Sequence, residues 1–266
     1  YGGVLTINTV TKEVNRLSFK SDRTLLVKDI RKYQNTVYIL DESKLYFFDV
    51  NTQKITKYTA SGLPKKLHSF VSIFGSNLVI GAEDGVYARK SSSSTWTKVV
   101  STSLPVNVMS SPDAAMAVSD SGESYYSTDG FNWNRVGVIN NQVVNKLQKH
   151  RSQMLFGTTK GLFQDGGPFY SGNLSLQLLD ILGDIEDSAA IGVNDIDSDF
   201  TKSLIGLSDG RYVVYADDFV VYTTSKLPTI HKVLIVNSDI WLFGNAYFKL
   251  ASESFIRKLA TGSTIN

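Results

Sequence analysis

The sequence lacks cysteine altogether and has no long apolar run. Without cysteine the 266-residue chain can form neither a disulfide nor a thiolate metal site, so an apolar core must hold it together. No stretch approaches the roughly 20 consecutive apolar residues of a membrane-spanning helix, and no charged-then-apolar signal segment opens the chain. We therefore expect no membrane insertion.

Net charge is also small. The formal charge of +2 gives no reason to expect binding to nucleic acid or to an anionic membrane. The charge is nevertheless uneven, because residues 1–100 contain 15 Lys and Arg against 8 Asp and Glu, whereas residues 101–266 contain 12 against 17. One basic and one acidic region could therefore attract each other between copies of the chain.

Long stretches of helical periodicity are missing too. Short runs of Val, Ile, Leu, Tyr and Phe alternate instead with Gly, Ser, Asn and Asp, which is typical of an all-β protein. All-β domains of this size often stand alone, so we expect residues 1–266 to form a single domain. Because the chain begins with Tyr1 and not Met, we expect it to be part of a longer polypeptide.

A repeat with a period near 40 residues organises these short runs. A Gly-x-x-x-Gly turn precedes apolar residues at 81–85, 157–161 and 206–210, and Leu-Pro recurs at Pro64, Pro105 and Pro228, which are separated by 41 and 123 residues. Turns at equivalent places follow one another at intervals of 36 to 49 residues. This is the size of a four-stranded antiparallel blade, so the repeat predicts a β-propeller.

The repeat predicts seven blades, the first of them incomplete. Residues 1–22 would supply only an outer hairpin, with strands at 4–8 and 14–19, and residues 23–266 would form six fuller blades. The first strands of those six blades are expected at 25–30, 69–73, 106–110, 144–149, 189–193 and 231–236, and the last fourth strand at 255–260. The alternative is six blades with the N-terminal hairpin packed outside the ring. If residues 4–19 paired only with each other, the seven-blade interpretation would fail.

One turn has a more specific pattern than the others. Between two short β-type runs, Ser127, Asp129, Gly130 and Trp133 form Ser-x-Asp-Gly-x-x-Trp. This turn resembles the Asp-box of sialidase-like and sortilin-like propellers and of bacteriophage tail proteins, although it is one residue shorter and lacks the Thr. We expect a structural role, with Asp129 accepting backbone N–H groups, Gly130 at positive φ and the Trp133 ring packed between sheets.

The resemblance includes sialidases, so catalysis has to be considered. A sialidase-like site would need an arginine triad, a Tyr–Glu pair and usually Arg-Ile-Pro, which is absent, and several of the eight arginines fall in or beside predicted outer strands, facing solvent. No motif nominates a carboxylate pair, a covalent nucleophile or a cofactor site. We predict that the chain is not an enzyme, with no catalytic residues and no cofactor.

A metal site is not expected either. His68 and His231 precede equivalent first strands, which indicates a repeated structural position. The acidic segment 184–199 contains Asp195, Asp197 and Asp199 at alternating positions, but the EF-hand pattern fails at Phe200 and Gly206. We interpret this segment as a solvated loop, with calcium binding as the alternative.

The favoured function is an interaction or assembly module. Polar turns between second and third strands should form the binding face. The candidate interaction residues in these turns are Asp41, Glu42, Glu83, Asp84, Ser119, Asp120, Lys160 and Asp209. Protein partners or self-assembly are expected, in a virion (phage tail nozzle or fibre) or extracellular setting that only the resemblance supports. The alternative is a carbohydrate-binding or glycoside-hydrolase propeller.

Overall fold

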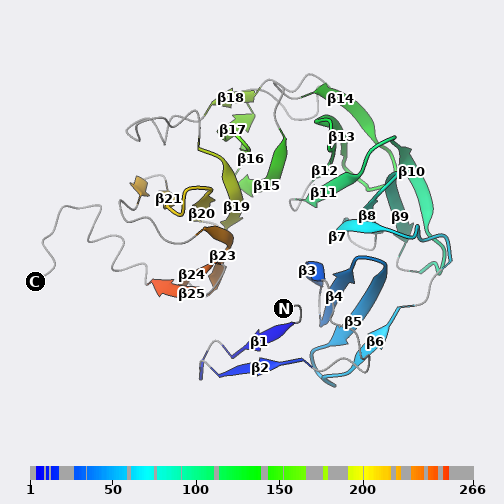
Figure 1. The fold of residues 1–266 in the computed structure, drawn as a ribbon, viewed down its shortest axis with the longest axis horizontal. Coiled ribbons are helices and arrows are strands. Elements are labelled where there is room, and N and C mark those ends of the chain that lie inside the picture. The colour runs from blue at the N-terminus through cyan, green and yellow to red at the C-terminus, as the bar shows by residue number, and fades with distance from the viewer. Residues whose placement is uncertain are drawn as a thin grey trace, which may run out of the picture. The chain divides into compact units, whose positions relative to one another are not determined.

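The computed structural model is all-β in its described part and contains 25 strands, β1 to β25, most of which are labelled in Figure 1. The structure describes residues 4–8, 10–11, 13–17, 27–33, 35–58, 61–74, 77–90, 92–110, 114–138, 143–151, 153–165, 176–178, 191–199, 201–216, 220–222, 229–236, 239–244 and 248–251. No helix with the length and hydropathy of a membrane span occurs in these residues. The chain divides into two compact units, residues 1–120 with 125–134 and residues 121–124 with 135–266.

Four-stranded antiparallel sheets with the strands in chain order are the repeated element. The first is β3 (Val27–Tyr33), β4 (Thr36–Asp41), β5 (Lys44–Asp49) and β6 (Ile55–Lys57), and the second is β7 (Leu67–Phe74), β8 (Asn77–Ala82), β9 (Gly85–Lys90) and β10 (Thr97–Ser101). The third is β11 (Val106–Ser110), β12 (Ala115–Ser119), β13 (Glu123–Ser127) and β14 (Asn134–Val138). Short turns rich in Gly, Asp and Ser join consecutive strands, as antiparallel pairing requires.

The pattern continues in the second half of the chain. The fourth sheet is β15 (Val144–His150), β16 (Gln153–Thr158), β17 (Gly161–Asp165) and β18 (Leu176–Leu178), and the fifth is β19 (Val193–Ser198), β20 (Lys202–Leu207), β21 (Tyr212–Ala216) and β22 (Val220–Tyr222). A three-stranded sheet follows, with β23 (Ile230–Val236), β24 (Asp239–Gly244) and β25 (Phe248–Ala251). β1 (Leu5–Ile7) and β2 (Val14–Arg16) form a separate hairpin.

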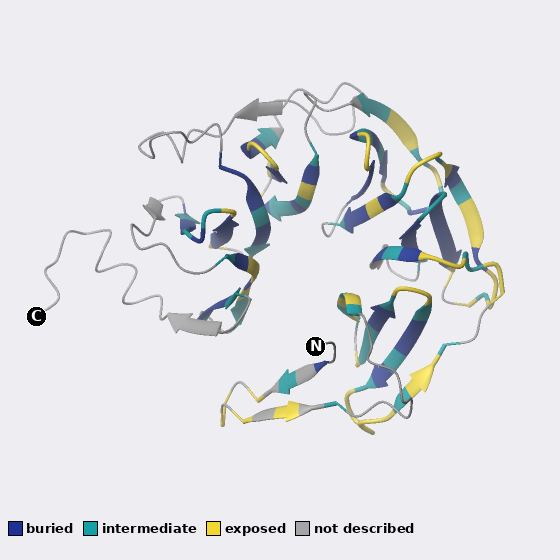
Figure 2. Cartoon of the chain, viewed as in Figure 1, coloured by how far each residue is buried: buried dark blue, intermediate teal, exposed yellow. Residues whose placement is uncertain are grey.

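The core lies between stacked sheets, so the inner strands of a sheet bury both faces (Figure 2). In unit 1, Leu40 and Leu45 face the β7–β10 sheet, whereas Ile39 and Tyr46, their neighbours along the strands, face Val4 of the N-terminal hairpin. In unit 2, one apolar cluster joins the β15–β18 and β19–β22 sheets and another joins β19–β22 to β23–β25. Fourth strands are more exposed, as β6 and β10 show.

Five of the six first strands in the described residues share an irregularity that the sequence repeat did not reveal, and only β11 pairs without it. The pairing register shifts at the second residue of β3, β7, β15, β19 and β23. The shifted residues are Lys28, His68, Asn145, Asn194 and His231. A bulge of this kind inserts one extra residue and re-aims the side chains after it. The predicted equivalence of His68 and His231 is confirmed.

The blade count differs from the prediction. Within the described residues the structure shows five four-stranded blades, where seven, or six with a hairpin, were expected. The sixth sheet has three strands, and the fourth strand predicted at 255–260 lies outside the described residues. In the described part of the chain, β1 and β2 pair only with each other, which contradicts the seventh-blade interpretation by its own criterion. The single-domain assignment stays a prediction.

Candidate functional site

A pocket of about 520 Å³ opens in unit 1 between the β3–β6 and β7–β10 sheets. Lys44 begins β5 and Lys57 ends β6, so these two residues lie at the same end of adjacent antiparallel strands. The segment that leads to β7 forms the facing wall, where Ser61 accepts a hydrogen bond from the Trp96 backbone N–H at 3.0 Å. The lining residues are Ser43, Lys44, Leu45, Lys57, Tyr58, Ser61, Leu63, Pro64 and Ser94.

A buried arginine lies behind this pocket. The Arg89 guanidinium carbon is 5.0 Å from the centroid of the Tyr58 ring and 5.6 Å from that of Trp96, and Nη1 donates a hydrogen bond to the Ser93 carbonyl. Burial raises the pKa of Tyr58, and the nearby positive charge of Arg89 opposes that shift. The expectation that arginines near outer strands face solvent is wrong for Arg89, because the two aromatic rings shelter its charge.

The turn at residues 127–133 is held by its own side chains. The Asp129 carboxylate accepts the backbone N–H groups of Phe131 at 2.8 Å and Asn132 at 2.7 Å. Ser127 Oγ accepts the Gly130 N–H, Gly130 has φ of +79°, and Trp133 Nε1 donates to the Gly130 carbonyl. These bonds hold the carboxylate of Asp129 to the backbone. Burial alone would raise its pKa, but the hydrogen bonds it accepts lower it below the usual value.

The same turn is anchored to a neighbouring sheet. Trp133 and Phe131 pack against the apolar cluster that joins β8 and β9 to β11 and β12, and Asn77 Nδ2 donates to the Asp129 carbonyl at 2.8 Å. The geometry is that of a structural turn that links blades.

The predicted interaction residues do lie in the turns between second and third strands or at their edges. Several of them, however, form ion pairs with lysine or arginine side chains of the same chain. Lys66 is 3.9 Å from Glu83, Lys98 pairs with Asp84, and Arg211 pairs with Asp209 at 2.5 Å. Asp41 accepts the Glu42 N–H at 2.8 Å, Ser119 is buried, and Asp120 and Lys160 are in turns. This partial neutralisation makes the turns less acidic than the sequence implies.

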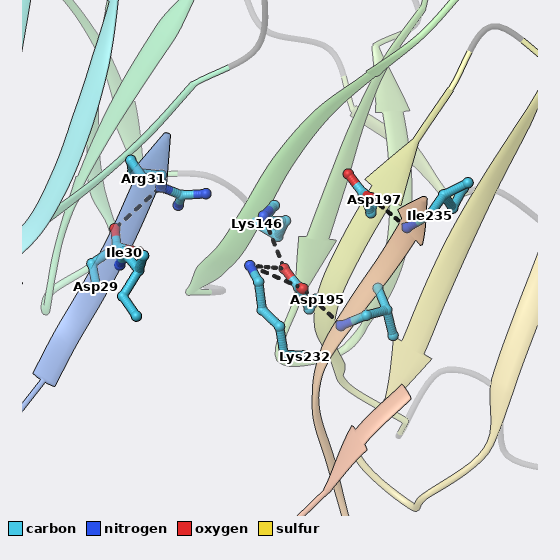
Figure 3. A network of polar contacts seen from close by, with 9 residues as sticks. Asp29, Ile30, Arg31, Lys146, Asp195, Asp197, Lys232 and Ile235 are labelled. Carbon is cyan, nitrogen blue, oxygen red and sulfur yellow. Dashed lines mark hydrogen bonds and ion pairs between the residues drawn. The ribbon is translucent and has the colours of Figure 1, made fainter. Parts of the chain in front are cut away.

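Unit 2 contains a charge network along three first strands (Figure 3). The Asp195 carboxylate of β19, with 5% of its side chain exposed, is 2.9 Å from Lys146 Nζ of β15 and 3.2 Å from Lys232 Nζ of β23. It also accepts the Val233 N–H at 3.0 Å. Burial would raise the pKa of Asp195, but the two lysines and this backbone bond together lower it. The network thus fastens three consecutive sheets.

Neighbouring polar residues reinforce this stacking. Asn145 and Asn194, both at bulge positions, donate through Nδ2 to the carbonyls of Val193 at 2.9 Å and Ile230 at 2.7 Å, each on the next first strand. In unit 1, Ser69 Oγ accepts the Val108 N–H at 2.6 Å in the same way. Polar residues on first strands therefore bond one sheet to the next.

The solvated-loop interpretation of the acidic segment is wrong for the part that the structure describes. Asp195 and Asp197 lie in strand β19, and Asp197 accepts the Ile235 N–H at 2.7 Å. Asp199 accepts the backbone N–H groups of Thr201 and Lys202 in the following turn. The calcium alternative gains no support, because these carboxylates bind the chain itself and no group of three potential ligands occurs in the described residues. Residues 184–190 lie outside them.

A buried polar cluster lies between β15 and β20. His150 Nδ1 is 2.8 Å from Ser203 Oγ, which is 2.6 Å from Ser198 Oγ, and the imidazole lies 4.9 Å from the Tyr215 ring. Burial lowers the pKa of His150, and Arg151 adds to this effect. With the imidazole and Ser203 both buried, the pair is shielded from a substrate in solution.

Comparisons with solved structures identify the architecture. YCF48 bound to D1 peptide matches with a TM-score of 0.70 and 14% identity over 90% of this chain and 81% of the other. YCF48 from Cyanidioschyzon merolae matches with a TM-score of 0.69 and 8% identity over 90% of this chain and 84% of the other. The WD40 β-propeller domain of Doa1 matches with a TM-score of 0.64 and 10% identity over 88% of this chain and 81% of the other. The chain is a β-propeller. No protein-family model and no curated protein sequence matches the propeller.

Sequence reasoning missed the pocket, Arg89 and the Asp195 network. A signal for the network was present, because Asn145-Lys146, Asn194-Asp195 and His231-Lys232 occupy the same repeat position. The pocket had no such signal, since its residues come from two strand ends, a linker and the β9–β10 turn.

Proposed function

We propose that this propeller is a non-catalytic module that binds other proteins. The observation that supports it is the chemistry of the unit 1 pocket. Its nine lining residues supply two lysines, three serines, one tyrosine and three apolar side chains, but no carboxylate and no histidine. General acid–base catalysis most often uses those missing groups, although lysine and tyrosine can also serve, and the combination of lysine, hydroxyl and aromatic groups suits recognition.

The solved neighbours are consistent with this proposal. One of them is YCF48 bound to D1 peptide, so a propeller with a similar fold holds a peptide. At 14% identity the likeness concerns the fold, and the partner of this chain has to be found independently. Self-assembly through an acidic second half is less favoured than the sequence implied, because the Asp195 carboxylate is bound by lysines of the same chain.

A glycan is the second candidate ligand. Tyr58 supplies an aromatic ring to the pocket, and hydroxyl-rich walls can hydrogen-bond a sugar. Glycoside hydrolysis needs two carboxylates roughly 5 to 9.5 Å apart, and the lining residues include none. A virion setting rests on the Asp-box resemblance of residues 127–133 alone.

Selection from a displayed library of random 12-residue peptides tests the proposal. We expect enriched peptides that bind the folded chain saturably and do not bind the heat-unfolded chain. The chain should release no product from chromogenic glycosides or from a labelled glycan panel. Turnover of any of these substrates, or the absence of enriched peptides together with saturable glycan binding, would overturn the proposal.

A further inference from the structure

Two lysines without an ion-pair partner among the described residues distinguish the unit 1 pocket. Lys66 and Lys98, elsewhere in the same unit, each lie near a carboxylate, whereas the described residues provide no ion-pair partner for Lys44 or Lys57. No lining residue is acidic. With no negative charge among the lining residues, these cations favour an anionic occupant.

The pocket also offers hydrogen bonds and apolar contact. Ser43 and Ser94 present hydroxyl groups, and Ser61 Oγ lies 3.2 Å from Thr95 Oγ1. Leu63, Pro64 and the Tyr58 ring make an apolar wall. Its volume of about 520 Å³ is within the range of pockets that enclose a small ligand or a short side-chain-bearing segment.

We infer that this pocket binds a carboxylate-bearing peptide segment, with Lys44 and Lys57 as the charged contacts. The inference rests on the proposed protein-binding function and specifies its partner. Lysine ammonium groups attract a carboxylate as point charges, serine hydroxyls donate to its oxygens, and the apolar wall packs against neighbouring side chains. The carboxylate can belong to Asp or Glu side chains or to a peptide C-terminus.

Nuclear magnetic resonance titration with three short peptides tests the inference. The probes are acetylated and amidated (Glu-Gly)3, its neutral (Gln-Gly)3 counterpart, and acetylated (Gln-Gly)3 with a free C-terminus. We expect the glutamate peptide, the free C-terminus, or both to shift the amide signals of residues 43–45, 57–58 and 61–63. The neutral amidated peptide should shift them much less, and added salt should weaken binding. The two carboxylate probes distinguish side-chain from terminal recognition.

Lysine variants locate the contact. Lys44→Gln and Lys57→Gln together should weaken binding by about tenfold, because each exposed ion pair contributes modestly. Lys54→Gln is the matched control, since Lys54 is exposed in the turn at the other end of the same β5–β6 hairpin. It should leave the affinity and the signal shifts unchanged, and all variants should keep the wild-type melting temperature.

The outcomes separate this inference from the proposed function. Equal binding of all three peptides, or equal losses in the Lys44/Lys57 and Lys54 variants, would overturn the pocket assignment. If selected library peptides bind while the carboxylate probes do not, the assignment is wrong and the protein-binding function stands. Failure of both peptide sets would count against the proposed function itself.

Discussion

The substitution Asp195→Asn should destabilise the chain far more than the substitution Asp197→Asn on the same strand. Asp195→Asn keeps the side-chain size and an acceptor for the Val233 N–H, but removes the negative charge between Lys146 and Lys232. The Lys146 side chain is only 11% exposed, so water compensates little for that loss. Removing one partner of a buried ion pair costs about 3 to 5 kcal/mol. Because Lys232 is 47% exposed, we expect the lower end of that range.

Asp197 is the matched control because its charge is disfavoured. Burial raises its pKa above the usual value of 3.8, although the Ile235 N–H and Lys146 oppose the shift. Asparagine can still accept the Ile235 N–H that Asp197 accepts at 2.7 Å. Asp197→Asn should therefore leave the free energy of unfolding at neutral pH unchanged or raise it.

The pH dependence of the two variants should differ in sign. The pKa of Asp195 is below its usual value of 3.8, so its contribution to stability is complete above that value and is lost as the pH falls through the folded-state pKa. The deficit of Asp195→Asn relative to wild type should shrink below about pH 4. Ionised Asp197 instead lowers the free energy of unfolding as the pH rises above its unfolded-state pKa, and this loss disappears when the pH falls again.

Urea unfolding followed by circular dichroism between about pH 3 and pH 7 measures both effects. Equal losses for the two variants at neutral pH would refute the reasoning. So would an Asp195→Asn deficit that stays the same across the whole pH range, because a charge-based contribution must vanish when the carboxylate is protonated.

Three further predictions concern single positions. Asp129→Ala removes the turn hydrogen bonds and should cost about 1 to 3 kcal/mol in urea unfolding while peptide binding persists; lost binding at wild-type stability would contradict a structural role. Gly85 and Gly137 both have positive φ, but an added Cβ overlaps the Val100 carbonyl oxygen only at Gly85. The melting temperature of Gly85→Ala should therefore be well below that of Gly137→Ala. Because burial lowers its pKa, His150 should titrate below 6.5 by nuclear magnetic resonance, and stability should fall as the pH drops below 6.5; a normal or raised pKa would contradict this.

The repeat made much of the fold predictable. The first strand expected at 106–110 coincides with β11, and the hairpin around Ser127 and Trp133 forms β13 and β14. The first strand of the fifth sheet was misplaced: residues 189–193 were predicted to form it, whereas β19 begins at Val193. Counting apolar residues favoured the run Ala189–Val193 over Asn194-Asp195-Ile196-Asp197, whose polar side chains are satisfied only by adjacent sheets.

The candidate site was less predictable than the fold, because it depends on which charges meet. The repeat predicted that Glu83 and Asp84 lie in a turn. It did not predict their ion pairs with Lys66 and Lys98, which come from segments outside that turn. Several arginines were expected to face solvent from outer strands, but the Tyr58 and Trp96 rings flank Arg89. Sequence distance carries little information about such contacts.

Polar residues play different roles in first strands and at strand ends. A first strand packs between two sheets, so Asp195 and Ile196 are both buried although they are consecutive, and the usual alternation of polar and apolar faces fails. A polar side chain there must find its partner on the adjacent first strand, as Ser69 finds Val108. Lys44 starts a strand at the open end of its sheet, where no such partner exists in the described residues. Buried polar residues of first strands therefore stabilise sheet stacking, and unpaired charges at strand ends are the groups available for binding.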